Sequence, residues 1–344
     1  MGSSSTGDEL WVSREEATCR HSRYRRIRTD DWKPILVAVD GSSESVSAAR
    51  FGARLAARTD TRWRLVHAVR DPGVVLTARL LQDNEAELEK ALAELIGPQL
   101  EEARSAALAS GAPGELVIRI GRPAPVLQAE TERVGAGLVI LGGKRHLALG
   151  RWLGGSTALD AARLLSAPVL ITKGELTDLD RVLVAIDLSP AAEPTIREAE
   201  RFARLAQGKL RAIHVIESLT TNPAVARWVD QQRFEGQSLA ALERRVWPRL
   251  QIVDAERTVR FGDVVHELTA EAAEWGAHLL VVGAHGKDWI DRLLLGSVTE
   301  RLINALPAPL LVEPLRIEPD GVAAQLAQVA KTPADPTGRV NDET

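Results

Sequence analysis

Short apolar runs alternate with amphipathic stretches along most of the chain. The run ILVAVD at 35–40 is apolar up to its final aspartate, which is typical of a strand buried on both faces of a parallel sheet. The stretch AARFGARLAAR that follows places Phe51, Leu55 and Ala56 on one face of a helix. The pattern therefore predicts a strand followed by a helix that packs on the sheet.

The same alternation continues to residue 313. It predicts strands over 35–40, 63–69, 115–120, 137–141, 168–172, 181–186, 209–216, 256–261, 278–282 and 309–313. Strands separated by helices imply a parallel sheet with helices on both faces. Ligands of such sheets bind beyond the carboxyl ends of the strands, where the direction of winding reverses. We therefore expect a binding site at those ends.

The segments between the predicted strands carry helical periodicity and helix-end signals. A long helical region is predicted over 78–109, interrupted near Pro98, and another over 222–247. Pro123 opens a further helix and Gly135 closes it. Proline suits a first turn because the amide that it lacks has no partner there, and glycine accepts the left-handed backbone that often follows a last turn.

The chain repeats itself. LVAVD at 36–40 returns as LVAID at 183–187, and RLVHAV at 64–69 returns as RAIHVI at 211–216, both 147 positions later. A unit of this length exceeds most solenoid repeats, so we interpret it as a duplicated domain. The two domains are called the first copy and the second copy.

From the end of the third predicted strand onward, the offset between the copies is 141 positions. Gly142 then corresponds to Gly283, and Gly155-Ser156 corresponds to Gly296-Ser297. The predicted organisation is an N-terminal tail, expected to be flexible, two domains and a C-terminal tail, over 1–31, 32–174, 180–316 and 317–344. The join between the domains is short and polar, so they should pack closely.

Composition and charge exclude several classes of protein. The 344 residues are 45% hydrophobic and 26% charged, as in an ordinary soluble globular protein. The formal net charge of -4 gives no reason to expect nucleic acid as a partner. No apolar run approaches the roughly 18–20 residues that span a bilayer, and the N-terminus lacks the apolar core of a signal peptide. Cys19 stands alone, which favours the reducing cytoplasm.

The segment VVGAHGKDWIDRLLLGSVTERL, residues 281–302, has glycines at both ends of a loop. Gly283 ends a predicted strand, Gly286 follows, and Gly296-Ser297 precedes a predicted helix at 298–305. Glycine permits a positive φ and a close approach of backbone to ligand, and a helix N-terminus offers unpaired amides to phosphate. The Ser297 hydroxyl could cap the helix or bond a phosphate oxygen. From the glycines alone, a phosphate cradle and an ordinary strand–turn–helix junction both remain open.

The spacing of this loop matches a family signature. Gly283, Gly286, Gly296 and Ser297 fit the pattern G-x2-G-x9-G-[ST] at every fixed position. The segments VLVAIDLS, HVIE, GSVTERL and PAPLLV also fit. The second copy thus resembles the ATP-binding branch of the universal stress protein family, and the resemblance covers both copies but neither tail. It implies an α/β fold of two tandem doubly wound domains, each with a five-stranded parallel sheet, Rossmann-like and similar to the adenine nucleotide alpha hydrolases.

The resemblance implies an ATP site in the second copy. Asp187 would face the ribose, although it could instead cap the next helix. Ala185, Ile186 and Val215 would line the adenine side. The residues expected around the sugar and phosphates are Val282, Gly283, His285, Gly286, Gly296, Ser297, Val298 and Thr299, with Lys287 as an additional phosphate contact. His285 could equally be an exposed loop residue, and whether magnesium accompanies the nucleotide stays open.

The first copy departs from the signature. Gly142, Gly155 and Ser156 are retained, as is Asp40, but Arg145 stands where the second copy has Gly286. If that position needs a positive φ, arginine costs roughly 1 kcal/mol or more. Its side chain could also fill the phosphate space or pair with a phosphate. We expect nucleotide binding in the second copy, with the first copy as its packing partner.

The last predicted strands, 168–172 and 309–313, would each leave one edge of a sheet unpaired. Members of the family usually dimerise along that strand. The resemblance therefore implies an internal pseudo-dimer of the two copies, with a further homodimer left open.

No catalytic set stands out. The chain has no P-loop G-x4-G-K-[ST], no Cys/His metal spacing and no G-x-S-x-G elbow, so we assign neither catalytic residues nor metal ligands. The repeated His67 and His214 are interpreted as packing or hydrogen-bonding residues. The expected function is a stress-response regulator that binds ATP or a related adenine nucleotide, with at most slow ATPase activity. The alternative is a tandem protein-interaction module that binds no nucleotide.

Overall fold

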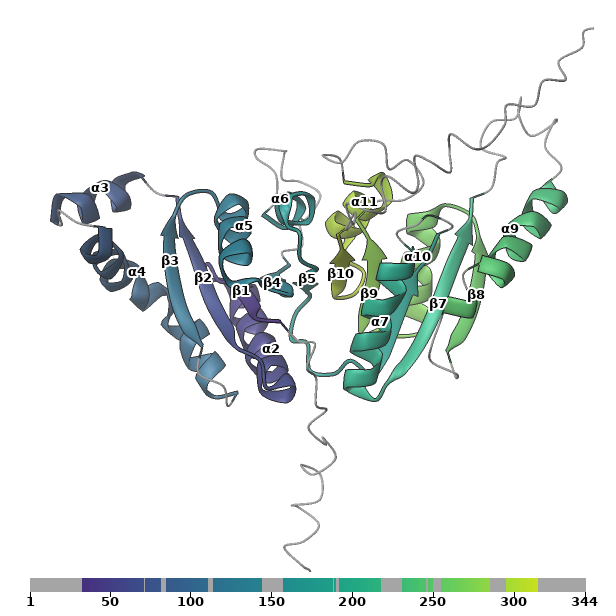
Figure 1. The fold of residues 1–344 in the computed structure, drawn as a ribbon, viewed down its shortest axis with the longest axis horizontal. Helices are drawn as coiled ribbons and strands as arrows, with labels where there is room; N and C mark the ends of the chain where they lie inside the picture. Colours follow the sequence, from purple (N-terminus) through teal and green to yellow (C-terminus); the bar gives the residue numbers. More distant parts are fainter. Residues whose placement is uncertain are drawn as a thin grey trace, which may run out of the picture.

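A computed structural model describes residues 33–70, 72–81, 85–110, 114–143, 157–187, 189, 192–217, 231–245, 247–249, 255–284 and 295–314. Within these ranges the strands form one ten-stranded sheet with the order β3-β2-β1-β4-β5-β10-β9-β6-β7-β8. Figure 1 shows the first copy and the second copy side by side in this sheet. Neighbouring strands within each copy are parallel.

Each copy contributes five strands, as expected. The strands of the first copy are β1 (Ile35–Ala38), β2 (Trp63–Val69), β3 (Glu115–Ile120), β4 (Leu138–Gly142) and β5 (Val169–Thr172). Those of the second copy are β6 (Arg181–Ala185), β7 (Lys209–Ile216), β8 (Glu256–Phe261), β9 (Leu279–Gly283) and β10 (Leu310–Glu313). Each copy has the strand order of a doubly wound parallel sheet, so the predicted fold class is confirmed.

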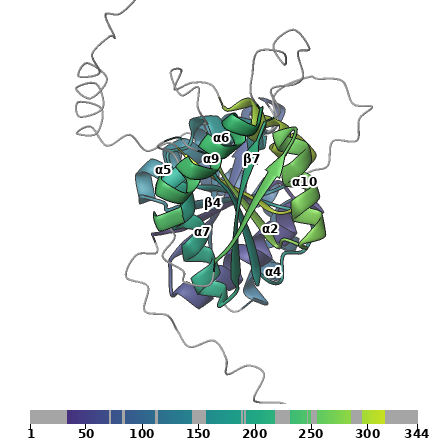
Figure 2. The same ribbon diagram turned by 90° about the vertical axis from the view of Figure 1, so that its right-hand side faces the viewer.

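Helices cover both faces of the sheet (Figure 2). Those of the first copy are α2 (Ser43–Thr59), α3 (Pro72–Leu81), α4 (Glu85–Leu108), α5 (Pro123–Val134) and α6 (Thr157–Leu164). Those of the second copy are α7 (Ala192–Ala206), α9 (Gln231–Arg245), α10 (Val264–Glu274) and α11 (Ser297–Ala305), with a short 3-10 helix, η2 (Trp247–Arg249). One apolar core joins α2, α4 and α7 to the sheet, and a second joins α5, α6, α10 and α11 to the opposite face.

Two helix predictions need correction. The interruption expected near Pro98 is absent, because α4 continues through that residue from Glu85 to Leu108. Ile96 and Leu100 are buried on either side of the proline, and this burial outweighs the hydrogen bond that proline removes. Helix α11 begins at Ser297, one residue before the predicted start. Part of the helical region predicted over 222–247 lies outside the described residues.

The two copies meet through β5 and β10, which pair antiparallel. Leu311 lies opposite Leu170, its own counterpart at the offset of 141, while Leu310 lies opposite Ile171. A register in which a residue faces its counterpart places a local two-fold axis between the two strands. The internal pseudo-dimer is thus present, and it pairs the two strand edges that the sequence predicted to be left open.

Candidate functional site

The winding direction of the second copy reverses between β6 and β9. Val184 pairs with Val281 in parallel, so the end of β6 at Ala185 and the end of β9 at Gly283 lie at the same edge of the sheet. Asp187 follows β6 directly. This is the position at which doubly wound sheets bind their ligands.

Asp187 organises the loop that leaves β6. Its Oδ1 accepts a hydrogen bond of 2.9 Å from the backbone amide of Ser189. In the first copy, Oδ1 of Asp40 accepts from the amide of Ser42 at 3.0 Å. There the N-cap of the following helix is Ser42 and not the aspartate. The aspartate side chain therefore folds the turn in both copies, and that of Asp187 is only half-buried.

A histidine is hydrogen-bonded to the backbone just before each aspartate; His214 is buried and His67 is half-buried. Nδ1 of His214 lies 2.8 Å from the carbonyl oxygen of Ile186, and Nδ1 of His67 lies 2.7 Å from that of Val39. Because a carbonyl oxygen can only accept, Nδ1 carries the proton in each ring. The prediction that these histidines act as hydrogen-bonding residues is confirmed.

The start of α11 is hydrogen-bonded to the end of β9. The amide of Gly296 donates to the carbonyl of Ala284 at 2.9 Å, and the buried hydroxyl of Thr299 donates to the carbonyl of Gly283 at 2.8 Å. Gly296 is the N-cap and supplies no side-chain hydrogen bond, while Ser297 is the exposed first helical residue. Among the described residues, no side chain caps the amides of the first turn, which lie at the edge of the sheet where ligands bind.

Close approach, and not backbone conformation, accounts for the glycine at the end of the fourth strand. Gly283 is not among the described glycines with a positive φ. In the first copy, a Cβ on its counterpart Gly142 would lie 2.5 Å from the backbone carbon of Glu44, at the start of α2. Gly296 has a φ of -59°, so it too needs no left-handed backbone. The expectation of a positive φ does not apply to these two positions.

The residues expected around adenine differ in accessibility. Ile186 belongs to the buried core under α7, and Val282 belongs to the core on the opposite face. Ala185 and Val215 are only half-buried beside that second core, so their side chains remain available to a flat apolar group. His285, Gly286 and Lys287 lie outside the described residues.

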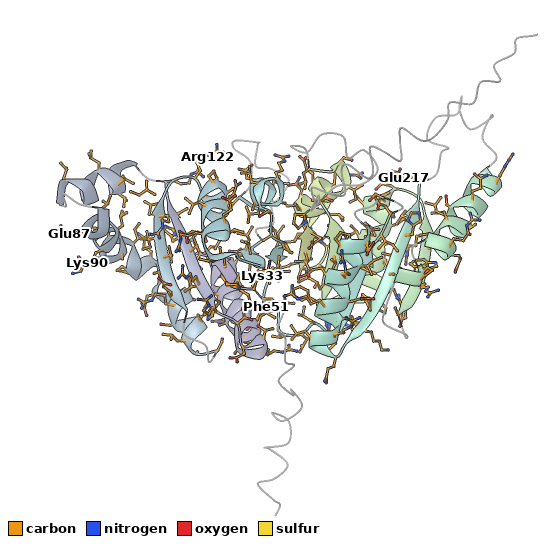
Figure 3. The ribbon with its side chains drawn as sticks, in the orientation of Figure 1. Lys33, Phe51, Glu87, Lys90, Arg122 and Glu217 are labelled. Carbon is orange, nitrogen blue, oxygen red and sulfur yellow. The ribbon has the colours of Figure 1, made fainter. Side chains whose placement is uncertain are left out.

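The sequence did not predict an ion pair that joins the start of α10 to α11. Both oxygens of Asp263, the N-cap of α10, accept hydrogen bonds of 3.1 Å from Arg301 of α11. These bonds, together with one from the backbone amide of His266, lower the pKa of Asp263 below its ordinary value. The pair at the same two positions in the first copy is Arg122 and Asp160, with the charges exchanged and an N···O distance of 3.7 Å. In Figure 3, Arg122 lies at the upper edge of the molecule, near the start of α5.

The two copies match the model of the universal stress protein family over residues 31–173 and 179–314. The chain therefore belongs to the universal stress protein family, and it is a tandem member. It is 29% identical over 291 residues to a universal stress protein of Mycolicibacterium smegmatis, an alignment that covers 81% of this chain and 96% of that protein.

Solved structures show the same fold. A universal stress protein from Archaeoglobus fulgidus superposes with a TM-score of 0.57 at 18% identity, over 81% of this chain and 97% of that one. A universal stress protein solved in complex with cAMP is similar to 42% of this chain and covers 98% of its own length, with a TM-score of 0.31 and 22% identity. That likeness is confined to about one copy.

Two further properties hold for the described residues. None of their helices combines the length and the apolar character that crossing a membrane requires. They also contain no group of three or more His, Cys, Asp or Glu side chains arranged to hold a metal ion.

Proposed function

We propose that this protein is a cytoplasmic regulator that binds ATP or a related adenine nucleotide in its second copy. The observation that carries the proposal is the N-terminus of α11, which no described side chain caps and which is hydrogen-bonded to the end of β9 beside the switch point. Backbone amides in that position bind phosphate groups, aided by the partial positive charge of the helix end.

Each described part of the site suits one part of a nucleotide. The first-turn amides of Ser297, Val298 and Thr299 would receive the phosphates. The half-buried carboxylate of Asp187 would accept hydrogen bonds from ribose hydroxyls, which are donors, and its bond to Ser189 fixes its orientation. Ala185 on β6 and Val215 on β7, which lies two residues beyond the register partner of Ala185, would contact the adenine ring.

Bound nucleotide would act on the protein as a ligand of the folded state. At a concentration 100 times its dissociation constant, such a ligand stabilises the fold by about 2.7 kcal/mol. Bound nucleotide would occupy the edge of the sheet where Gly296 and Thr299 are hydrogen-bonded to the end of β9. A partner that contacts this edge of the sheet would then meet a different surface in the loaded protein.

Two variants test the site directly. Asp187→Ala removes the proposed ribose contact, and Ser297→Pro removes one phosphate-binding amide. Proline fits this position, because it is the first residue of the helix and Gly296 before it has a ψ of 138°. Each variant should lower ATP affinity by about tenfold or more, which corresponds to the roughly 1.4 kcal/mol of one lost hydrogen bond to a charged group.

The measurement is the thermal shift on titration with ATP, with and without magnesium, alongside calorimetric titration. Asp40→Ala in the first copy is the matched control and should leave affinity unchanged. Equal ATP affinity in Asp187→Ala, Ser297→Pro and the unmodified protein would mean that the nucleotide site lies elsewhere. The absence of any shift at millimolar ATP would instead favour the interaction module without nucleotide. Multiple-turnover phosphate release that Asp187→Ala abolishes would mark a slow ATPase.

A further inference from the structure

The first copy donates hydrogen bonds to residues near both ends of α11. Nη2 of Arg163, in the last turn of α6, donates to Oε2 of Glu300 in the first turn of α11 at 3.0 Å. Beyond the other end of α11, Nζ of Lys173 donates to the carbonyl oxygen of Pro307 at 2.6 Å. Helices α6 and α11 lie side by side above the junction of β5 with β10 (Figure 1).

Close packing also joins the first copy to the C-terminal end of α11. A Cβ on Gly143 would lie 2.5 Å from Cδ2 of Leu306, the C-cap of α11. The glycine therefore lets the first copy approach α11 more closely than any other residue would allow. Leu306 is itself fixed, because it is buried and adopts a left-handed φ of 40°.

The corresponding residues of the second copy cannot form the same ion pair or lysine contact with α6. At the offset of 141 positions, Arg163 corresponds to Asn304 and Glu300 corresponds to Leu159. Lys173 corresponds to Pro314, which has no side-chain donor. The interface between the copies is therefore symmetric in its strand pairing but asymmetric at its helices. The helix that receives these contacts, α11, belongs to the copy with the intact glycine signature.

The charge on Glu300 matters to the proposed phosphate site. Glu300 is three residues, or about 4.5 Å of helix rise, beyond Ser297. A carboxylate in a first turn interacts favourably with the helix dipole but repels an anion bound at the same end. Arg163 offsets this repulsion, and since the two side chains are only 34% and 29% exposed, solvent screens their interaction incompletely.

We propose that the first copy is a built-in positioning partner for the nucleotide site of the second copy. Arg163 neutralises Glu300, and Arg163, Lys173 and Gly143 together fix the orientation of α11. The inference deepens the proposed function and rests on it for the identity of the ligand. It assigns a role to a copy whose own glycine signature is interrupted at Arg145.

A charge cycle in the full chain tests the electrostatic part. Arg163→Met keeps the length of the side chain, removes its charge and should weaken ATP binding by about fivefold, as expected for roughly 1 kcal/mol. Arg163→Lys should restore most of the affinity. The double variant Arg163→Met with Glu300→Gln should bind about as tightly as the unmodified protein, because no unpaired carboxylate remains. Asn304→Met, at the matching position of the second copy, should change nothing.

Hydrogen exchange in the ligand-free protein tests the positioning part without nucleotide. Arg163→Met should raise the exchange rates of amides in α11 and leave those of α10 unchanged. If wild-type protein binds no ATP, the proposed function fails, whereas faster exchange confined to α11 still supports positioning by the first copy. Unchanged exchange in α11 would overturn the inference. Equal ATP affinity in the unmodified protein, Arg163→Met, Arg163→Lys and the double variant Arg163→Met with Glu300→Gln would also overturn it.

Discussion

At the scale of single residues, buried glutamates tie the outer strands of each copy to a helix. Glu130 of α5 accepts from Nε of Arg119 on β3 at 2.9 Å and also pairs with Arg133. Its counterpart Glu271 pairs with Arg211 and Arg260. Each carboxylate is almost fully buried, so its charge is stabilised by two guanidinium groups and not by water.

The pKa of Glu130 makes a pH-dependent prediction. Burial raises the pKa of Glu130, but hydrogen bonds and charge from Arg133 and Arg119 outweigh it and hold the pKa below the ordinary value. A depressed pKa in the folded state adds stability above the unfolded-state pKa, and that stability is lost as pH falls through the lowered value. Glu130→Gln should therefore cost about 1–3 kcal/mol at pH 7 and progressively less in acid.

Urea unfolding between neutral and acidic pH measures this difference. The control is Glu132→Gln, on the exposed side of the same helix, which should change the free energy of unfolding by less than about 0.5 kcal/mol. A cost for Glu130→Gln that is constant across the pH range would contradict the role of the charged carboxylate.

At the scale of elements, the sequence predicted strands better than helix interiors. The bounds of β2, β3, β7 and β8 agree with the apolar pattern at both ends. In the interior strands β2 and β7 the pattern succeeds because strands covered by helices on both faces are largely apolar; it also succeeds in the edge strands β3 and β8, which are only partly buried. It failed at Pro98 because packing against α2 decides whether that helix continues, and a local rule for proline contains no information on packing.

The candidate site was predictable only in its local part. The glycine spacing located the start of α11 and the aspartate located the end of β6, since both depend on neighbours in sequence. The ion pairs of Asp263 with Arg301 and of Arg163 with Glu300 join elements far apart in the chain, so no local pattern marks them. Aligning the copies at the offset of 141 would have revealed the first, because its charges are exchanged in Arg122 and Asp160.

Two helical glycines should respond in opposite directions to alanine. A Cβ on Gly236, inside α9, meets no atom within 4 Å, whereas a Cβ on Gly52, inside α2, would lie 2.5 Å from Cγ2 of Val37. Gly236→Ala should raise the free energy of unfolding by roughly 0.5–1 kcal/mol, because alanine loses less backbone entropy. Gly52→Ala should lower it by about 1–3 kcal/mol through overpacking of the sheet. Urea unfolding of both variants measures the two changes, and a loss of stability in Gly236→Ala or a gain in Gly52→Ala would contradict the prediction.

At the scale of the whole molecule, the two copies share one core. The apolar cluster on the α2, α4 and α7 face runs through both copies and includes Leu170 of β5 and Leu311 of β10. Side-chain donors cross the junction as well, from Nη2 of Arg54 to the carbonyl of Leu176 and from Nη2 of Arg58 to that of Leu205. A core that crosses the junction means that neither copy can unfold without exposing apolar surface of the other.

The shared core predicts one cooperative transition in which Leu170 and Leu311 are coupled. Both are fully buried and lie opposite each other in the antiparallel pair. Leu170→Ala and Leu311→Ala should each lower the free energy of unfolding by about 2–5 kcal/mol. Together they should cost less than the sum of the single effects, because each side chain packs against the other across the junction.

Tryptophan fluorescence and circular dichroism should report the same urea midpoint for the unmodified chain, since Trp63 and Trp275 lie in different copies. Leu65→Ala, combined with Leu311→Ala, is the control for this double-mutant comparison. Leu65 is also buried in this core, but it lies on β2, which is four strands and about 19 Å from β10. Its cost should add to that of Leu311→Ala within about 0.5 kcal/mol. Two separate transitions, or strict additivity of the Leu170 and Leu311 variants, would mean that the copies are independent domains that merely touch.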